Sequence, residues 1–125
     1  MSEGPTYEDF AWAVKTGDLD RVKEFVEKHK FGLGPDPSSS NKRTPLHWAA
    51  DFNQTAIISY LLSKGADINA KDQYGITPLL AAVYEDHFDA AKTLVEKKAD
   101  VSAKGPDGQT AKQRAEKDSI KALFK

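Results

Sequence analysis

The feature that most constrains the fold of this chain is a sequence pattern that repeats about every 33 residues, the length of a short structural repeat. The stretch TPLHWAA begins at Thr44, TPLLAAV begins at Thr77, and TAKQRA begins one further period along the chain, at Thr110. A second stretch, KGADINAKD from Lys64, returns as KKADVSAKG from Lys97 at the same spacing. Because two separate phases of the pattern share one period, chance does not account for it. The chain is therefore expected to be an array of similar units.

Each period carries the signals of two helices. Thr-Pro places a capping side chain ahead of a proline at the first helical position, where the missing N–H costs nothing. Polar pairs at residues 53–54 and 86–87 end this first helix. Apolar residues then recur at helical spacing, as at Ile57 and Leu61, and predict a second helix.

A turn follows the second helix and leads the chain to the next Thr-Pro. Gly65 is expected to end the helix in the left-handed conformation, which glycine adopts without steric cost. Residues 66–70 are expected to run extended, and residues 72–75, DQYG, are typical of a turn. Each unit is thus predicted to be helix, helix, turn.

A unit of this length and pattern resembles the ankyrin repeat, whose Thr-Pro-Leu-His-x-Ala stretch is matched at residues 44–49. The resemblance implies an all-α repeat protein, an ankyrin-repeat solenoid, because one repeat cannot bury its own apolar face and must stack on neighbours. Both ends look modified as capping repeats: FAWAVKTGDLDRVKEFVEK lacks Thr-Pro, and DSIKALFK is a second helix about one turn short. We expect one domain, residues 1–125, of about four helix-turn-helix units, two of them full central repeats, at roughly 7–38, 39–71, 72–104 and 105–125.

The period is broken once, near the N-terminus. Trp12 and Trp48 align at a spacing longer than the period, and the excess lies in FGLGPDPSSSNKR, which is typical of an enlarged loop. Its three serines, residues 38–40, lie close to Lys42 and Arg43 and could accept phosphate, which is the alternative to a purely structural loop. Both tryptophans fall on the packing side of the first helix and are expected mainly in the core, with Trp12 partly exposed.

Composition limits the partners and the compartment. The 18 Lys and Arg and 19 Asp and Glu residues are interspersed and leave a formal net charge of -1, so no net field attracts nucleic acid. The absence of cysteine excludes disulfides and thiolate zinc sites. No signal peptide and no membrane-spanning run are evident. We expect a cytoplasmic or nuclear protein, a monomer when free, without nucleic-acid or membrane partners.

No arrangement of side chains in the sequence indicates catalysis. His29, His47 and His87 do not pair at the spacing that lets a helix present two metal ligands. The glycines in residues 32–35 lack the flanking strand and helix of a dinucleotide site. One period after His47 the residue is Leu80, so a structural role is expected for this histidine, and the ankyrin resemblance implies a hydrogen bond within its own turn. No metal, no cofactor and no enzymatic activity are predicted.

The ankyrin resemblance implies a concave face lined by positions that are free of packing. These positions are the turn tips Ser40, Asn41, Arg43, Gln73, Tyr74, Ile76, Pro106, Asp107 and Gln109, and the helix ends Lys15, Thr16, Asp51, Phe52, Tyr84, Glu85 and Glu116. Three of them, Phe52, Tyr74 and Tyr84, are aromatic and have carboxylates nearby. Large rings supply anchors and charges steer a partner, so this face is the predicted binding surface.

Four stretches, WAVKTGDLDRVKEFV, KGADINAKD, ITPLLAAVYEDH and KGPDGQTA, resemble the myotrophin family of small ankyrin-repeat proteins. The resemblance implies a protein that binds the heterodimeric actin capping protein, inhibits barbed-end capping and so promotes filament growth. The expected partner-binding residues are Trp12, Asp51, Phe52, Tyr74, Tyr84, Glu85 and Asp107. The longer first loop departs from the family pattern, as do Phe52 and Trp48. The alternative is a generic ankyrin adaptor, or an inhibitor of a kinase, transcription factor or other assembly, that uses the same concave face.

Overall fold

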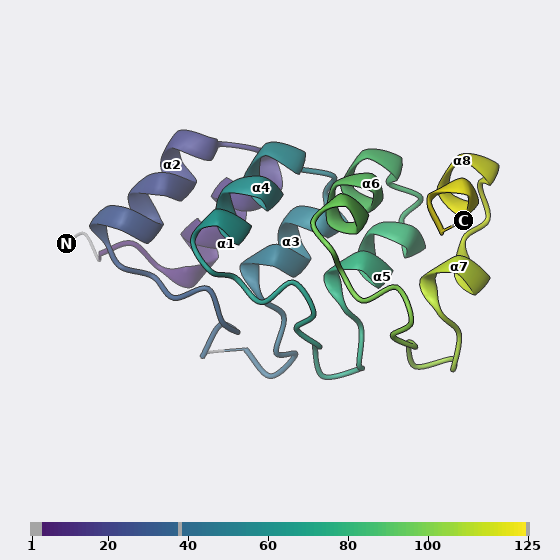
Figure 1. The fold of residues 1–125 in the computed structure, drawn as a ribbon. Coiled ribbons are helices and arrows are strands. Elements are labelled where there is room, and N and C mark those ends of the chain that lie inside the picture. The colour runs from purple at the N-terminus through teal and green to yellow at the C-terminus, as the bar shows by residue number, and fades with distance from the viewer. Residues whose placement is uncertain (1–3, 38, 125) are drawn as a thin grey trace.

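The structure, a computed structural model, describes residues 4–37 and 39–124 and is an array of helix pairs (Figure 1). The elements are α1 (Tyr7–Thr16), α2 (Leu19–Lys23), η1 (Glu24–Lys28), α3 (Pro45–Asp51), α4 (Thr55–Ser63), α5 (Pro78–Tyr84), α6 (Phe88–Glu96), α7 (Ala111–Arg114), α8 (Asp118–Lys121) and η2 (Ala122–Phe124). A π-helical turn, η1, continues α2, and a 3-10 turn, η2, continues α8. Ser38, one of the three loop serines, lies outside the described residues.

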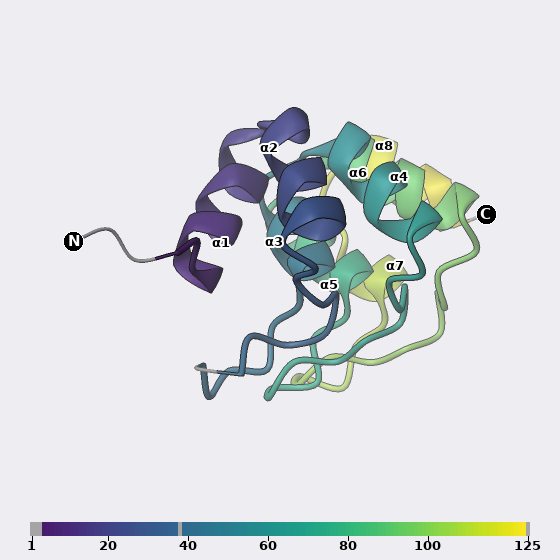
Figure 2. The same ribbon diagram turned by 90° about the vertical axis from the view of Figure 1, so that its left-hand side faces the viewer.

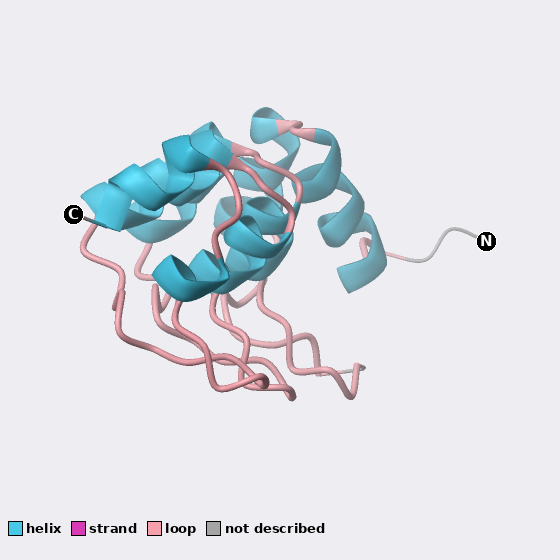
Figure 3. Cartoon of the chain, turned by 90° about the vertical axis from the view of Figure 1, so that its right-hand side faces the viewer, coloured by secondary structure: helices cyan, strands magenta, loops and turns pink. Residues whose placement is uncertain are grey.

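The helices form two layers, and the long loops that connect successive helix pairs all extend from the same side of these layers (Figures 2 and 3). Helices α1, α3, α5 and α7 pack side by side in one row, and α2, α4, α6 and α8 pack in the other (Figure 1). The long connections between successive pairs extend away from the helices in the same direction (Figures 2 and 3). Within the described ranges the chain has no strand, only an isolated antiparallel bridge between Lys104 and Thr110. The predicted all-α repeat fold is therefore confirmed.

The Thr-Pro signals begin helices where the sequence predicts them. The hydroxyl oxygens of Thr44 and Thr77 accept hydrogen bonds from backbone N–H groups three residues ahead, at 3.3 and 3.2 Å. Proline follows each threonine at the first helical position. Thr110 caps α7 in the same way, without a proline. Each such cap contributes about 1 kcal/mol to the stability of its helix.

The breaks between paired helices also follow the prediction, but the extended segment does not. Asn53 and Asp86 adopt left-handed φ values of 58° and 57°, which short polar side chains tolerate better than other non-glycine residues. Gly65 is left-handed as well, at 95°. Residues 66–70 are not extended throughout: the Ala70 N–H donates to the Asp67 carbonyl at 3.2 Å and closes a turn. The Asp67 side chain stabilises this turn by accepting from the next-but-one backbone N–H.

The core of the array lies between the two helix layers. Small residues such as Ala49, Ala50 and Ala82 are fully buried and let the first helices of neighbouring pairs approach closely. Larger side chains from the second helices, including Ile58 and Leu94, fill the space between the layers. Because each unit buries apolar surface against its neighbours, stability comes from stacking rather than from any single helix pair.

An aromatic cluster closes the N-terminal end of this core. The Phe10 ring lies 5.3 Å from that of Phe25 and meets Trp48 edge-on at 5.8 Å. Phe31, at the start of the enlarged loop, packs edge-on against Phe25 at 5.1 Å. Edge-to-face and offset pairs of this kind add to the stability gained by burial. The enlarged loop is therefore anchored in the core at its first residue, which composition alone did not indicate.

The two tryptophans have opposite environments, and Trp12, expected in the core with partial exposure, is more exposed than expected. Trp48 is 8% exposed because it packs against the first unit, on Phe10. Trp12 is 69% exposed. It occupies the corresponding side of α1, the first helix of the array. The same position in the repeat is thus core in one unit and surface in the other.

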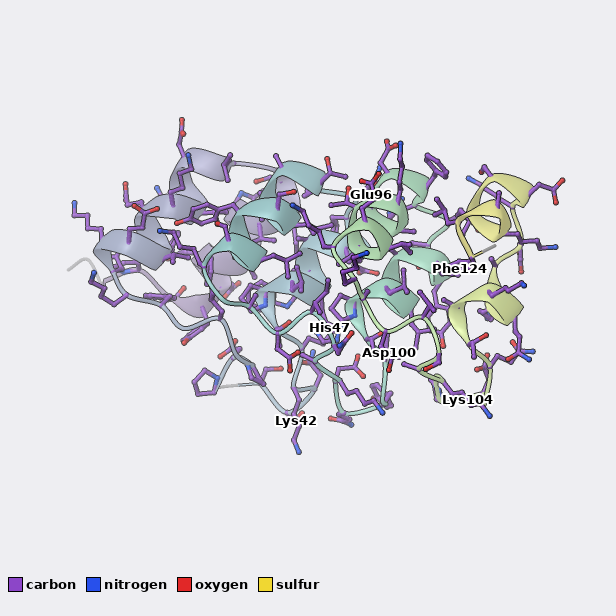
Figure 4. All side chains as sticks on the ribbon, viewed as in Figure 1. Lys42, His47, Glu96, Asp100, Lys104 and Phe124 are labelled. Atoms are coloured by element: carbon purple, nitrogen blue, oxygen red, sulfur yellow. The ribbon has the colours of Figure 1, made fainter. Side chains whose placement is uncertain are left out.

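His47 is structural, as its leucine counterpart indicated. The buried ring lies where the helices meet the loops (Figure 4). Its Nδ1 accepts from the Thr44 N–H at 3.1 Å, and its Nε2 donates to the Ile76 carbonyl at 2.7 Å. A carbonyl can only accept, so the Nε2-protonated neutral tautomer is required. The histidine therefore secures its own turn, as expected, and also ties its unit to the next one.

Acidification is expected to weaken the fold through His47. Burial lowers the pKa of His47, so the folded state binds fewer protons than the unfolded state, whose histidine pKa is about 6.5. The contribution of His47 is thus fully present above about pH 6.5 and decreases as the pH falls below it, by at most about 1.4 kcal/mol per pH unit. Urea unfolding at several pH values checks this.

The matched variant for that experiment is His47→Leu, which copies the residue at the equivalent position, Leu80. This variant is expected to be less stable at neutral pH because the Ile76 carbonyl loses its donor. Its free energy of unfolding should also fall less steeply on acidification, since other titrating groups are shared by both proteins. An identical pH slope for the two proteins would show that His47 is not the group responsible.

Candidate functional site

Four of the seven expected partner-binding residues converge on one hollow of about 280 Å³ between the second and third units. This central hollow is lined by Asn41, Arg43, Asp51, Asp72, Tyr74, Ile76, Ala81, Tyr84 and Glu85. The expected residues among them are Asp51, Tyr74, Tyr84 and Glu85. The solenoid thus brings together side chains that lie far apart in the sequence.

The repeat explains why these residues meet. Asp51 ends α3 and Tyr84 ends α5, and stacking of the two helices places their C-terminal ends side by side. Tyr74 belongs to the turn that precedes α5, and Asn41 to the loop that precedes α3. The Gln73 N–H donates to the Asn41 carbonyl at 2.8 Å and joins the two connections. Helix ends therefore form one wall of the hollow and turns the other.

Asp72 fixes the turn that carries Tyr74. Its buried carboxylate oxygen Oδ1 accepts from the N–H groups of Tyr74 and Ile76, each at 2.9 Å. The Gly75 N–H, in the left-handed region at φ 80°, donates to the Asp72 carbonyl at 3.0 Å. Hydrogen bonds to the side chain and the carbonyl of Asp72 therefore fix the conformation of the turn. It presents the Tyr74 ring, 60% exposed, at the rim of the hollow.

Arg43 braces the floor of the hollow between two carboxylates. Its Nη1 lies 3.5 Å from Asp51 Oδ2, and its Nε lies 3.4 Å from Asp72 Oδ2, an ion pair without hydrogen-bond geometry. Asp51 is half-buried in this arrangement and paired with Arg43, so it is less free than expected. The lining includes three carboxylates, those of Asp51, Asp72 and Glu85, and one guanidinium, that of Arg43, so the hollow has a formal charge of -2.

Tyr84 is also less free than expected, because the fourth unit covers part of its ring. The Arg114 guanidinium of α7 lies over the ring, with Cζ 5.3 Å from the ring centroid. Burial, together with the Asp107 carboxylate, raises the pKa of the Tyr84 phenol. Glu85, the next residue, is exposed. The pair therefore offers a fixed aromatic surface beside an accessible carboxylate.

The other three expected residues lie outside the central hollow. Phe52 is 46% exposed, with the Lys15 ammonium 5.6 Å from its ring centroid. Asp107 lies on the last turn and pairs with Arg114 at 3.6 Å. Trp12 borders two hollows on α1, of about 310 and 340 Å³, and both are also lined by Asp9. These residues could extend a binding surface, but the structure does not gather them with the central four.

Sequence reasoning missed the residues that hold the site in shape. Arg43 was expected at a turn tip, but its two ion pairs were not. Arg114, which lies over the Tyr84 ring, was not among the residues expected on the binding face. Asp72 is the first residue of DQYG, and an aspartate at the start of a turn is a signal that could have indicated its role. Arg114 has no such local signal, because its aromatic partner belongs to the preceding unit and is distant in sequence.

Metal and membrane sites were searched over the described ranges, 4–37 and 39–124. There, no group of three or more histidine, aspartate or glutamate side chains is placed to hold a metal ion. None of the helices in those ranges combines the length and the apolar character needed to cross a bilayer.

The sequence of the chain is similar to those of several known proteins. Residues 10–105 match a family model of ankyrin repeats in three copies. Myotrophin from Xenopus tropicalis is 47% identical over 116 residues, which are 93% of this chain and 96% of that protein. The 26S proteasome non-ATPase regulatory subunit 10 from Dictyostelium discoideum is 36% identical over 78% of this chain, but over only 41% of its own length. The ARF GTPase-activating protein Git from Drosophila melanogaster is 37% identical over 72% of this chain and 12% of its own length.

Proposed function

Because the chain belongs to the ankyrin-repeat family and is myotrophin-like, we propose that it binds the heterodimeric actin capping protein and inhibits barbed-end capping. Ankyrin repeats are protein-interaction modules, so binding to another protein is the general function expected of this fold. The proposal adds the identity of the partner. Less capping leaves more barbed ends free, and filament growth increases as a result. The protein acts as a non-catalytic monomer in the cytoplasm, without a cofactor, nucleic acid or membrane.

The observation that carries the proposal is the central hollow, set in a chain that aligns with a myotrophin along nearly its whole length. Its excess of two negative charges favours a cationic side chain over a neutral or acidic one. The exposed ring of Tyr74 adds a flat surface on which a guanidinium or ammonium group can rest, and the Tyr84 ring, over which Arg114 already lies, lines the hollow beside it. An arginine or lysine side chain of the partner is therefore the ligand that suits this hollow.

The mechanism is occlusion of a basic surface. Tyr74 and Tyr84 serve as aromatic anchors and Glu85 as the accessible carboxylate, while Asp51 is held in place by Arg43. Trp12, Phe52 and Asp107 extend the contact along the array. When the face is occupied by capping protein, the basic surface with which capping protein meets actin is covered. Inhibition then requires no chemical step.

Purified components test this proposal directly. The protein is titrated into capping protein by calorimetry, and barbed-end elongation is followed in the presence of both proteins. Saturable binding with recovery of elongation supports the proposal. No binding at micromolar concentrations would remove capping protein as the partner, and a pull-down that instead recovered a kinase or transcription factor would favour the adaptor alternative.

A further inference from the structure

Gly105 lies directly against the hydroxyl end of the Tyr84 ring. A β-carbon at Gly105 would overlap Tyr84 Oη, whereas it would lie 3.5 Å from Cζ, an ordinary van der Waals distance. The obstacle to a larger residue is therefore the hydroxyl oxygen and not the ring carbons. Gly105 is not among the glycines with positive φ, so its backbone conformation does not itself exclude alanine.

The loop around Gly105 is closed by its own hydrogen bonds and cannot easily retreat from the ring. The Gly105 N–H donates to the Gln109 carbonyl at 2.9 Å, and the Gly108 N–H donates to the Gly105 carbonyl at 3.0 Å. The Asp107 carboxylate accepts from the Gln109 N–H at 3.0 Å. A side chain introduced at Gly105 is thus expected to displace the tyrosine rather than the loop.

Arg114 holds the same ring from another element. Its guanidinium lies over the Tyr84 ring, and its Nε is 3.6 Å from Asp107 Oδ2 on the Gly105 loop. The loop and α7 thus contact the tyrosine together, although neither lines the central hollow. Through Tyr84, the fourth unit touches the lining of the central hollow.

We infer that Gly105 and Arg114 are positioning residues, which set the Tyr84 ring in the orientation that partner binding requires. The fourth unit then has two roles: it covers the end of the stack, and it orients Tyr84 for partner binding. This inference rests on the proposed function for its effect on affinity, but the position of the ring itself can be measured without any partner.

The test is a double-mutant cycle of Gly105→Ala and Tyr84→Phe. With tyrosine at residue 84, Gly105→Ala is expected to weaken binding to capping protein by about tenfold, within the usual range for coupled neighbours. In the Tyr84→Phe background the same substitution is expected to have almost no effect, because the overlapping oxygen is gone. Gly32→Ala is the matched control, since among the described residues no heavy atom beyond its own chain neighbours lies within 4 Å of its β-carbon position. An equal loss of affinity in both backgrounds would overturn the inference.

A second readout separates this inference from the proposed function. In the free protein, the nuclear Overhauser effect between the Tyr84 ring protons and the Gly105 α-protons should be strong, and Gly105→Ala should shift the Tyr84 ring signals. Amide signals elsewhere should stay in place, which shows that the fold is intact. Unshifted Tyr84 ring signals would overturn the inference even if capping protein binds. If the wild-type protein does not bind capping protein, the proposed function fails while the ring signals still test the positioning role.

Discussion

Replacing Tyr84 by alanine and Glu85 by lysine in one variant is expected to weaken binding to capping protein by about 100-fold or more. Truncation of a central aromatic anchor costs about 2 kcal/mol, and every 1.4 kcal/mol is a factor of ten in affinity. Reversal of the exposed Glu85 charge adds repulsion against a cationic ligand. Calorimetry measures the affinity, and barbed-end elongation should no longer recover when this variant is added.

The matched control makes the same two changes on the other helix layer. Tyr60 of α4 is partly buried, as Tyr84 is, and Glu96 of α6 is exposed, as Glu85 is. Neither lines the central hollow. The variant with Tyr60→Ala and Glu96→Lys is expected to bind as the wild type does, with both folds checked by circular dichroism. A similar loss of affinity in both variants would mean that the binding surface has been misplaced.

Phe10→Ala is expected to reduce the free energy of unfolding by about 3–5 kcal/mol, the usual cost of removing a buried phenylalanine ring. Phe10 is fully buried and contacts Phe25, Phe31 and Trp48 at once, so its loss is expected to leave a cavity between these rings. Since domains are stable by only about 5–15 kcal/mol, the loss is a large part of the total. Urea unfolding followed by circular dichroism provides the measurement.

Phe52→Ala is the comparison, because it removes the same ring from a position that is 46% exposed. Its unfolding free energy is expected to change by less than about 1 kcal/mol, as for most surface substitutions. If the two variants were equally destabilised, the aromatic cluster would not be a main source of stability at the N-terminal end. If Phe52 belongs to the binding surface, Phe52→Ala should weaken partner binding more than Phe10→Ala does when both variants are folded.

Several local features could be predicted because they depend on neighbouring residues. The Thr-Pro pairs cap helices through a side chain and a backbone N–H three residues ahead, so the signal and its effect lie within one turn. Asn53 and Asp86 take left-handed conformations for a reason that also lies in their own side chains. The expectation of an extended segment at residues 66–70 was wrong, however, because the Asp67 side chain accepts a hydrogen bond from a nearby backbone N–H and stabilises a turn there.

The candidate site was predicted less completely, because its residues act through distant partners. Tyr84 and Glu85 were expected on one face and are found there, beside Tyr74. What holds them could not be predicted: Arg43 reaches Asp51 and a turn of the next unit, and other contacts cross from the fourth unit to the third. The binding role of all seven expected residues stays a prediction until the variants are measured.

The sequence alone determined the repeat, its period and the start of each central helix pair, because these follow from caps, turns and spacing within a few residues. Only the tertiary structure decided which equivalent positions are buried. Trp12 and Trp48 occupy the same place in successive units, yet one is exposed and the other is core. The physical reason is that burial in a stacked array depends on the neighbouring unit, and a residue's own sequence context carries no record of what packs against it.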